Sequence, residues 1–407
     1  MECEARAIGP RLAGLFLSRL DCARLMGTIY CDYNATTPLD PEVRAAMWPF
    51  LTEIWGNPSS LHQYGRRARA VLDQARDRAA AVLGAKPSEI IFTSGGTESV
   101  NLAILGAARA RRHEGRHLIT SSIEHHAVLQ AMAYLERHEG FRVTRLPVTR
   151  EGLVEPDQLA AALDEETVLV SIMAANNEIG TLQPVRELAA VCRRRGVWFH
   201  TDAVQFFGKM EFNSVHELGA DLVSLCGHKF HGPKGAGLLY IRSPLRVHPL
   251  QFGGPHENEL RAGTENLPGI IGLVTAMERF LRPPVFEPSR MRLMTKALLQ
   301  GLLEVPGVEL LGSAQQRLPN TVAVGVRGLD SMTLVAGLDI EGVCASAGSA
   351  CSAGAMEPSH VAKALGVSPE IAAGLVRFSL GRENTPDDIP RIVEAFRTVV
   401  SRGRTGG

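Results

Sequence analysis

The sequence predicts an α/β protein with a large domain built on a mostly parallel sheet covered by helices, followed by a smaller α+β domain at its C-terminal end. Between Pro41 and Arg282, short β-rich runs alternate with helical patterns of roughly ten to fifteen residues, which is typical of repeated βαβ units. The segment 282–290 ("RPPVFEPSR") interrupts this alternation, and separate strand and helix signals follow it. The apolar fraction of 45% over 407 residues is sufficient for a large core.

The strands of the large domain are predicted from runs of β-branched, aromatic and other apolar residues. In chain order, these runs are 89–94, 116–122, 141–148, 167–175, 197–203, 221–227 and 235–242. Ligands of such sheets bind at the carboxyl ends of the strands. The polar residues that follow these runs are therefore the candidates for a functional site.

Four parts of the chain are expected. Residues 1–27 are a disordered leader or an artefact of the start site, and 28–40 form a segment that packs with the small domain. Residues 41–284 form the large domain, and 285–407 form the small domain. Basic residues around a short apolar stretch at 12–17 also resemble a targeting peptide, but this stretch is too short to span a bilayer.

Charge and cysteine content restrict the partners. The 43 Lys and Arg residues balance the 43 Asp and Glu residues, so no net field attracts the chain to nucleic acid or to a membrane surface. The seven cysteines are odd in number and include no C-x-x-C pair, which fits neither a disulfide framework nor a zinc site. A cytoplasmic protein is expected.

The run 89–94 leads through glycines into an amphipathic helix that begins near Gly96 and Thr97. The backbone N–H groups of such a helix start, together with the Thr97 hydroxyl, form a seat for a phosphate group. The alternative is an ordinary cap by Ser94 or Thr97, with Glu98 in the first turn.

Two further strand ends carry ionisable groups. Asp202 ends one hydrophobic run and could hold a protonated pyridine nitrogen, or could simply cap a helix. Lys229 follows another buried-looking run, where a desolvated amine titrates low enough to form a Schiff base. Lys234 is the rival lysine, but no strand precedes it directly.

His125 and His126 lie at a fourth strand end, where an imidazole can stack on a ring and transfer protons near pH 7. Packing within the core or at the surface is the alternative. Asn176 and Asn177 follow another strand, and a side-chain amide there could bind a phenolic oxygen or simply form a turn. Taken together, these strand ends predict a site for pyridoxal-5′-phosphate (PLP).

The reaction type is predicted from the segment "GVCASAGSACSAGAMEPSH". Cys351 lies among small residues, which indicates a mobile loop, and an exposed free thiol is a liability unless it is used. Cys344 is the competitor, but it could still belong to a strand. Arg377, in "LVRFSLGREN", could hold an amino acid's carboxylate through two hydrogen bonds, or could form a structural salt bridge.

Several of these motifs resemble those of the NifS/IscS-type cysteine desulfurases of the class V aminotransferase family, in particular the group with a long mobile catalytic loop. The resemblance extends from about Ile29 to the C-terminus. It rests on the motifs "DYNATTP", "FTSGGTES", "EHHAVL", "NNEIG", "TDAVQ", "GHKFHGPKG", "RAGTEN", "GSACSAG" and "RFSLGR".

This resemblance implies PLP-dependent transferase fold type I, a homodimer, and a sulfurtransferase that converts L-cysteine to L-alanine through a persulfide on the enzyme. Sulfur would then pass to an iron–sulfur scaffold or a tRNA thiouridylase. No resident metal is implied, although Cys351 could ligate a cluster transiently.

The resemblance also assigns roles to individual residues. Lys229 would be the Schiff-base lysine, Cys351 the persulfide carrier and His125 the stacking and proton-transfer residue. Asp202 would bind the pyridine nitrogen, with Asn177 and Gln205 near the cofactor oxygen and Arg377 at the substrate carboxylate. The remaining implied contacts are Gly96, Thr97, Cys226 and His228 at the phosphate, Thr264 at the partner subunit's phosphate, and Asn34 and Asn177 at the substrate.

Cys226 departs from the family pattern, because many relatives have serine at this position. A thiol is a weaker hydrogen-bond donor, which puts its phosphate contact in doubt. Three alternative functions stay open: a selenocysteine lyase, an aminotransferase or β-lyase acting on another amino acid, and a catalytically idle protein that only binds a sulfur-transfer partner. Lys229 and Cys351 argue against the last, because a binding module needs neither.

Overall fold

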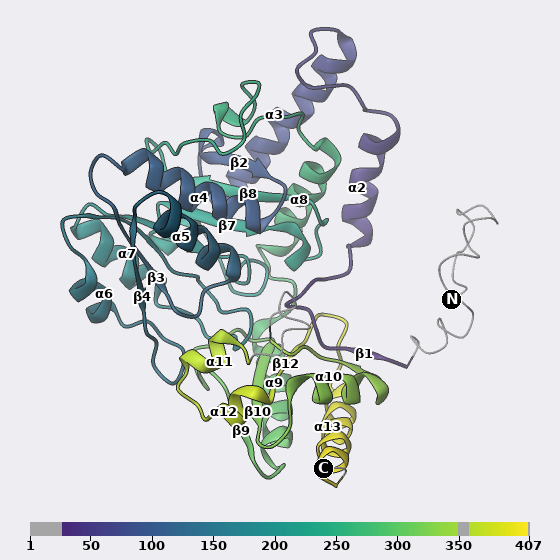
Figure 1. The fold of residues 1–407 in the computed structure, drawn as a ribbon. Coiled ribbons are helices and arrows are strands. Elements are labelled where there is room, and N and C mark those ends of the chain that lie inside the picture. Colours follow the sequence, from purple (N-terminus) through teal and green to yellow (C-terminus); the bar gives the residue numbers. More distant parts are fainter. Residues whose placement is uncertain (1–26, 349–357, 406–407) are drawn as a thin grey trace.

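A computed structural model of the chain describes residues 27–348 and 358–405. Figure 1 shows a larger layered part, and below it a smaller part that contains the C-terminal helix. The strands are β1 (Ile29–Tyr30), β2 (Ile90–Thr93), β3 (His117–Ser121), β4 (Arg142–Leu146), β5 (Thr167–Ser171), β6 (Trp198–Asp202), β7 (Leu222–Cys226), β8 (Gly237–Ile241), β9 (Val308–Leu310), β10 (Thr321–Val326), β11 (Val343–Cys344) and β12 (Leu375–Ser379). The helices are α2 (Pro41–Thr52), α3 (Gln63–Leu83), α4 (Gly96–Arg111), α5 (His126–His138), α6 (Pro156–Ala162), α7 (Val185–Arg194), α8 (Leu267–Phe280), α9 (Pro288–Leu303), α10 (Ser331–Ile340), α11 (His360–Ala364), α12 (Pro369–Ala373) and α13 (Asp388–Thr405).

The larger sheet has seven strands in the order β2-β8-β7-β6-β5-β3-β4. The pairs from β7 to β4 are parallel, whereas β8 runs antiparallel to both of its neighbours. Each β-rich run predicted from the sequence contains one of these strands. The α/β class with a mostly parallel sheet is therefore confirmed.

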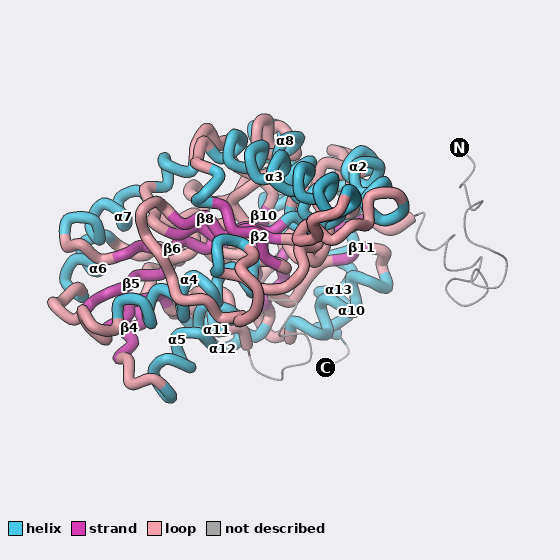
Figure 2. Tube along the Cα trace, turned by 90° about the horizontal axis from the view of Figure 1, so that it is seen from above, coloured by secondary structure: helices cyan, strands magenta, loops and turns pink. Residues whose placement is uncertain are grey.

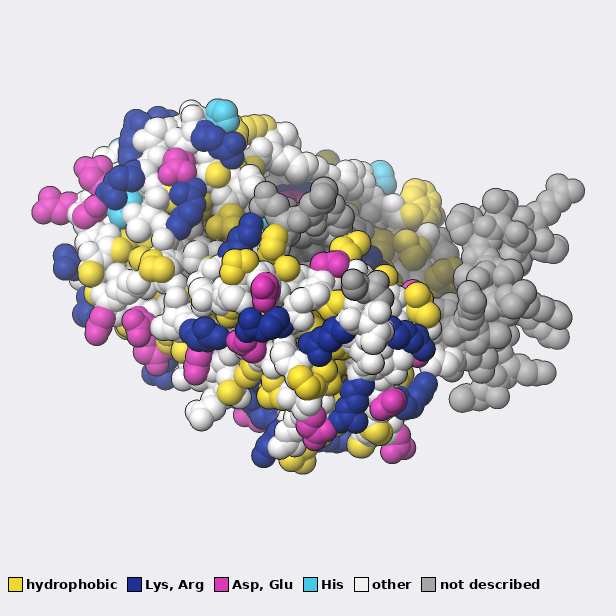
Figure 3. Space-filling model, turned by 60° about the horizontal axis from the view of Figure 1, so that its bottom comes forward, with side chains coloured by type: hydrophobic (Ala, Val, Ile, Leu, Met, Phe, Trp, Pro, Cys, Tyr) yellow, Lys and Arg dark blue, Asp and Glu magenta, His cyan; other side chains and the backbone are white. Residues whose placement is uncertain are grey.

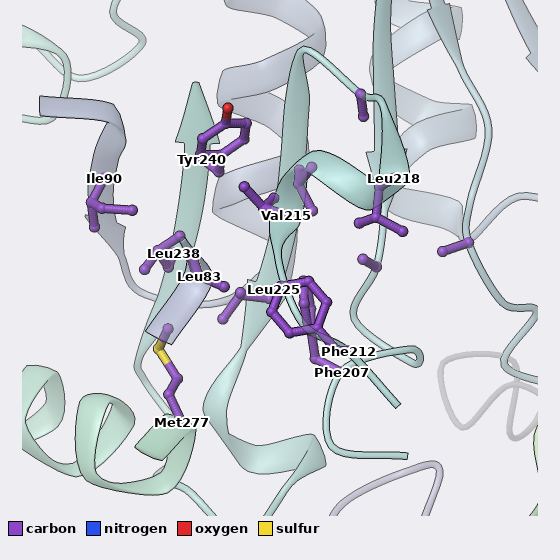
Figure 4. Close-up of a cluster of buried hydrophobic side chains, with 14 of the residues drawn as sticks. Leu83, Ile90, Phe207, Phe212, Val215, Leu218, Leu225, Leu238, Tyr240 and Met277 are labelled. Atoms are coloured by element: carbon purple, nitrogen blue, oxygen red, sulfur yellow. The ribbon is translucent and has the colours of Figure 1, made fainter. Parts of the chain in front are cut away.

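Helices cover both faces of the larger sheet (Figures 1 and 2). One face packs with α3, α7 and α8 in a buried cluster that includes Leu225, Leu238 and Met277 (Figure 4). The other face packs with α4 and α5 through a second buried cluster. Because both faces are covered, the central strands β5 and β7 are buried along their whole length, and apolar residues predominate in them.

The smaller sheet is antiparallel, in the order β12-β10-β9. Alternate residues of β10 point to opposite faces: Val322 and Val324 pack in the cluster formed with α9, α10 and α13, whereas Ala323 packs with α11 and α12. Ile123 and Ile179, which follow strands of the larger sheet, belong to this last cluster. The two sheets are thus joined by apolar contacts beside the strand ends.

The segment that follows β1 connects the two parts of the molecule. β1 pairs in parallel with β11, and the chain then passes upward to α2 (Figure 1). The division of the chain at residues 27, 40 and 284 stays a prediction.

The molecular face drawn in Figure 3 carries intermixed basic and acidic side chains. This mixture is what the balanced composition predicts. Within residues 27–348 and 358–405, no helix is long and apolar enough to cross a membrane.

Candidate active site

A cavity of about 270 Å³ lies at the carboxyl ends of the parallel strands. It brings together nearly all of the predicted site residues that the structure describes. Its lining includes Asn34, Gly96, Thr97, His125, Asn177, Asp202, Gln205, Cys226, His228, Lys229 and Arg377. Of the residues to which the resemblance assigns a role, two are not among them, since Thr264 lines a separate cavity of about 190 Å³ and Cys351 lies outside the described residues.

The start of α4 forms one end of the cavity. Gly95 is its N-cap and no side chain caps the helix, so the alternative in which Ser94 or Thr97 caps α4 is wrong. The Glu98 carboxylate accepts a hydrogen bond from the Ser94 N–H at 2.8 Å, and Thr97 is exposed. The uncapped N–H groups and the positive end of the helix dipole can therefore receive an anion.

Cys226 and Gly96 lie side by side beneath this helix start. The Gly96 N–H donates to the thiol, and burial raises the pKa of Cys226 to about 11. A Cβ atom at position 96 would lie 2.8 Å from the Val204 side chain, so any larger residue there would require this side chain to move. The thiol is neutral at pH 7 and can offer only a weak S–H donor to a phosphate.

Lys229 lies in the cavity just after β7. Its Nζ donates to the backbone oxygens of Asn34 at 2.8 Å and Ala35 at 2.7 Å, and burial lowers its pKa. Lys234 is exposed and does not line the cavity. Of the two candidate lysines, Lys229 has the partly desolvated amine that nucleophilic chemistry requires.

Asp202 ends β6 and is 7% exposed. Its Oδ1 accepts a hydrogen bond from the Val204 N–H at 3.0 Å, and burial raises its pKa to about 6. This bond closes a local turn, and no α-helix begins there, so a helix-cap role does not account for the residue. Within residues 27–348 and 358–405 this buried carboxylate forms no ion pair, and such a group favours a protonated nitrogen beside it.

His125 caps a helix and also lines the cavity. It is the N-cap of α5, since its Nδ1 accepts a hydrogen bond from the Ala127 N–H at 3.1 Å. Burial lowers its pKa to about 4, and the accepting Nδ1 assigns the proton of the neutral ring to Nε2. His126 does not line the cavity and its ring contacts that of His360, with the centroids 4.8 Å apart.

Arg377 is almost completely buried, with 1% exposure. Its Nη2 lies 2.5 Å from Asp32 Oδ1, and its Nη1 donates to the Asn177 backbone oxygen at 2.8 Å. Its Nε has no partner among the described residues. Arg377 therefore combines a structural salt bridge with a free donor near the cavity.

The side chains of Asn176 and Asn34 are already hydrogen-bonded within the protein. Asn176 binds backbone groups of Ile123, Glu178 and Ile179, and it does not line the cavity. The Asn34 side chain donates to Thr321 Oγ1 at 2.9 Å and accepts from Lys209 Nζ at 2.8 Å. Its amide is thus engaged within the protein, and its backbone oxygen meets Lys229.

Three residues with close roles in the site were missed by the sequence reasoning. Asp32 pairs with Arg377, Glu124 is fully buried beside His125, and Lys209 contacts Asn34 and Gln205. A charged residue inside an apolar or tightly turning stretch, such as Lys209 in "QFFGKMEF", is the sequence feature that could have indicated a buried functional group.

The residues present fit PLP. The α4 start suits its phosphate, Asp202 suits its ring nitrogen, and the Lys229 amine suits its aldehyde carbon. A neutral imidazole at His125 can lie against the ring without introducing charge.

Comparison with known proteins agrees with this geometry. Residues 29–392 match the family described as class-V aminotransferases. The chain is 47% identical over 378 residues to the cysteine desulfurase IscS of Dictyoglomus turgidum, covering 93% of this chain and 95% of that protein. The chain is a member of the class V aminotransferase family, of the NifS/IscS cysteine desulfurase type. This assignment confirms the resemblance found in the sequence motifs.

Other desulfurase relatives support the same assignment. The cysteine desulfurase IscS of Methanosarcina thermophila is 48% identical over 377 residues, covering 92% of this chain and 93% of that protein. Among solved structures, a NifS-like protein superposes with a TM-score of 0.85 at 38% identity, over 92% of this chain and 100% of the other. The NifS-like protein of Rickettsia africae gives a TM-score of 0.81 at 30% identity, over 92% and 99%.

Proposed function

We propose that this desulfurase converts L-cysteine to L-alanine with PLP as cofactor and leaves the sulfur as a persulfide on Cys351. The observation that carries the proposal is the position of Lys229, whose amine lies in one cavity with Asp202, His125 and Arg377. An acid, a base, a nucleophile and a carboxylate receptor in one enclosed site are what amino acid chemistry on PLP requires.

The residues of the cavity would hold the cofactor at three points. The α4 start with Thr97, Cys226 and His228 binds the phosphate, and Asp202 binds the ring nitrogen. Gln205 and Asn177 lie near the ring oxygen. When bound, PLP withdraws electrons from the substrate carbon that carries the amino group.

The protein's own groups would position the substrate and move protons. Arg377 binds the cysteine carboxylate, which fixes the substrate's amino group toward Lys229. Lys229 accepts and returns protons at the substrate carbon, and His125 Nε2 exchanges protons on the ring side. Burial lowers the pKa of Lys229, which favours the neutral amine that can accept a proton, and burial also lowers the pKa of His125, which keeps its ring neutral with the proton on Nε2.

The sulfur transfer would use Cys351 as a thiolate. A sulfur–sulfur bond forms between Cys351 and the substrate sulfur while the substrate's carbon–sulfur bond breaks. The carbon then takes up protons and leaves as alanine. The persulfide passes to an acceptor such as an iron–sulfur scaffold or a tRNA thiouridylase in the cytoplasm.

We also propose a homodimer in which Thr264 reaches the partner's phosphate. Two observations support this. Thr264 lies outside the chain's own main cavity, and large apolar side chains are exposed on neighbouring segments, among them Trp55 (67%), Leu61 (89%) and Phe252 (83%). Ser59 and His256, 3.2 Å apart, join these segments. Exposed aromatic residues grouped in this way are typical of an interface.

The function is tested by incubating the PLP-loaded protein with L-cysteine and a thiol reductant, without a 2-oxo acid. Equal amounts of alanine and sulfide are expected. A requirement for a 2-oxo acid, or formation of pyruvate and ammonia, would instead identify an aminotransferase or a β-lyase. Parallel assays with selenocysteine distinguish the lyase alternative.

A further inference from the structure

Lys209 is a buried lysine that the proposed mechanism does not use. It lies seven positions after the end of β6, in the turn that also carries Gln205, and is 2% exposed. Phe207, two positions before Lys209, packs in the core of the larger part (Figure 4). The turn is thus held firmly beneath the cavity.

The contacts of Lys209 are polar but uncharged. Its Nζ donates to Asn34 Oδ1 at 2.8 Å and to Gln205 Oε1. Within the described part of the chain, no carboxylate forms an ion pair with it. Burial of an amine without a counter-ion is costly, so a structural role alone would favour a neutral side chain at this position.

These contacts fix the orientation of the Gln205 amide. Gln205 Nε2 donates to the Asn34 backbone oxygen at 2.9 Å, and this oxygen can only accept. The Gln205 Oε1 faces an N–H of Lys209 on the other side. With Lys209 present, a flipped amide would lose both bonds, so Nε2 has one orientation and keeps a second N–H.

We propose that Lys209 is a positioning residue that orients Gln205 so that an amide N–H, and not the amide oxygen, faces the bound cofactor. Gln205 lines the cavity beside Asn34 and Lys229. The ring oxygen of PLP is an acceptor and carries negative charge when it is deprotonated. The inference rests on the proposed function, because it assigns the N–H to the PLP oxygen.

Lys209 also acts on Lys229 through Asn34. The Asn34 side chain accepts from Lys209, and its backbone oxygen accepts from Lys229 at 2.8 Å. The same residue therefore fixes both the amide of Gln205 and one acceptor of the Schiff-base lysine. Removal of Lys209 should disturb the electrostatics of the cofactor before it disturbs the fold.

The test is a pH titration of the visible absorbance of the PLP-loaded protein. In Lys209→Met the midpoint is expected to rise by about one pH unit, because the deprotonated ring oxygen loses a donor and holds its proton more tightly. Lys209→Arg keeps only donors at this position and should titrate close to wild type. Lys296→Met, the same change at an exposed position of α9, should have no effect.

A double-mutant cycle with Gln205→Leu separates positioning from a general effect of charge or packing. If Lys209 acts through Gln205, Lys209→Met adds little to the shift already caused by Gln205→Leu. Shifts that add in full, or an unchanged midpoint in Lys209→Met, would overturn the inference. If Lys209→Met does not fold, Lys209→Leu, which also lacks a donor, replaces it, and the same shift is expected.

Failure of the proposed desulfurase function would give a different result from failure of the positioning role of Lys209. In that case the wild-type protein would bind no PLP or would release no alanine from cysteine. A wild-type protein that does both, with Lys209 variants that titrate normally, would overturn the positioning role alone.

Discussion

Arg377 Nη2 lies 2.5 Å from Asp32 Oδ1, so the guanidinium proposed to bind the substrate already binds a carboxylate from the segment after β1. The two residues are far apart in sequence and meet because β12 bonds to this segment, with Asp32 bridged to Ser379. The pair fixes the plane of the guanidinium, while Nε has no hydrogen-bond partner in the part of the chain that the structure describes. This arrangement predicts that binding of the substrate carboxylate requires the planar guanidinium of Arg377, and not only its positive charge.

Arg377→Lys should raise the KM for cysteine by roughly tenfold to a hundredfold, since an ammonium cannot keep Asp32, Asn177 and the substrate carboxylate in one plane. The visible absorbance of bound PLP should be unchanged. Steady-state assays measure this, with Arg391→Lys at an exposed position of α13 as the control. A wild-type KM in Arg377→Lys would remove the residue from the substrate site.

Lys229→Ala should abolish the covalent link to the cofactor. Borohydride reduction of the PLP-loaded protein should label Lys229 in the wild type and in Lys234→Ala, because Lys234 lies outside the cavity. Peptide mass spectrometry locates the label. A label on Lys234, or one that persists in Lys229→Ala, would contradict the assignment.

Cys226→Ser should tighten PLP binding about twofold to tenfold, because a hydroxyl is a better donor to phosphate than a buried neutral thiol. Equilibrium titration of the apoprotein with PLP measures the Kd. Cys192→Ser is the matched control, since Cys192 is fully buried in α7 away from the cavity. Cys192→Ser should lower the stability of the protein without changing the Kd for PLP. A higher Kd in Cys226→Ser than in wild type would show that the thiol makes the better contact with the phosphate.

Glu124→Gln should change how the stability of the apoprotein depends on pH. Glu124 is fully buried, accepts from Ser121 Oγ at 2.6 Å, and has a pKa raised to about 8 by burial. The unfolded carboxyl releases its proton near its usual pKa of about 4.3, whereas the folded one retains it. The free energy of unfolding of wild type, relative to the variant, should therefore fall by a few kcal/mol as pH rises from about 4.5 to about 8.

Urea unfolding of both apoproteins at pH 5 and pH 8 measures this difference. Glu53→Gln makes the same change at the exposed end of α2 and should show no such trend. A wild-type-minus-variant difference that does not vary with pH would mean that Glu124 is ionised in the folded protein throughout this range.

Much of the cavity could be predicted from the sequence, because parallel strands end at one edge of a sheet. Asp202 ends β6, Lys229 follows the neighbouring strand β7, and His125 follows β3, so the strand pattern alone brings them together. The prediction that Cys344 could belong to a strand is also confirmed, since it ends β11. These features depend on local periodicity and on the direction of the strands.

The contacts between the two sheets could not be predicted in the same way. Asp32 meets Arg377, and Asn34 meets Lys209 and Thr321, only after the N-terminal segment has packed against both parts of the molecule. Such contacts depend on tertiary packing and leave no periodic signal. The uncapped start of α4 was also ambiguous in sequence, because Ser94, Thr97 and Glu98 all suit a capping arrangement.

The central claim is that Cys351 carries the sulfur, and mass spectrometry after a single addition of L-cysteine tests it most directly. One tryptic peptide, 328–363, contains both Cys344 and Cys351, so fragment ions between the two residues are needed to locate the added atom. The prediction is one extra sulfur on Cys351, also in Cys344→Ser, and none in Cys351→Ala, which still binds PLP. Added sulfur on Cys344, or alanine production by Cys351→Ala at the wild-type rate, would contradict it.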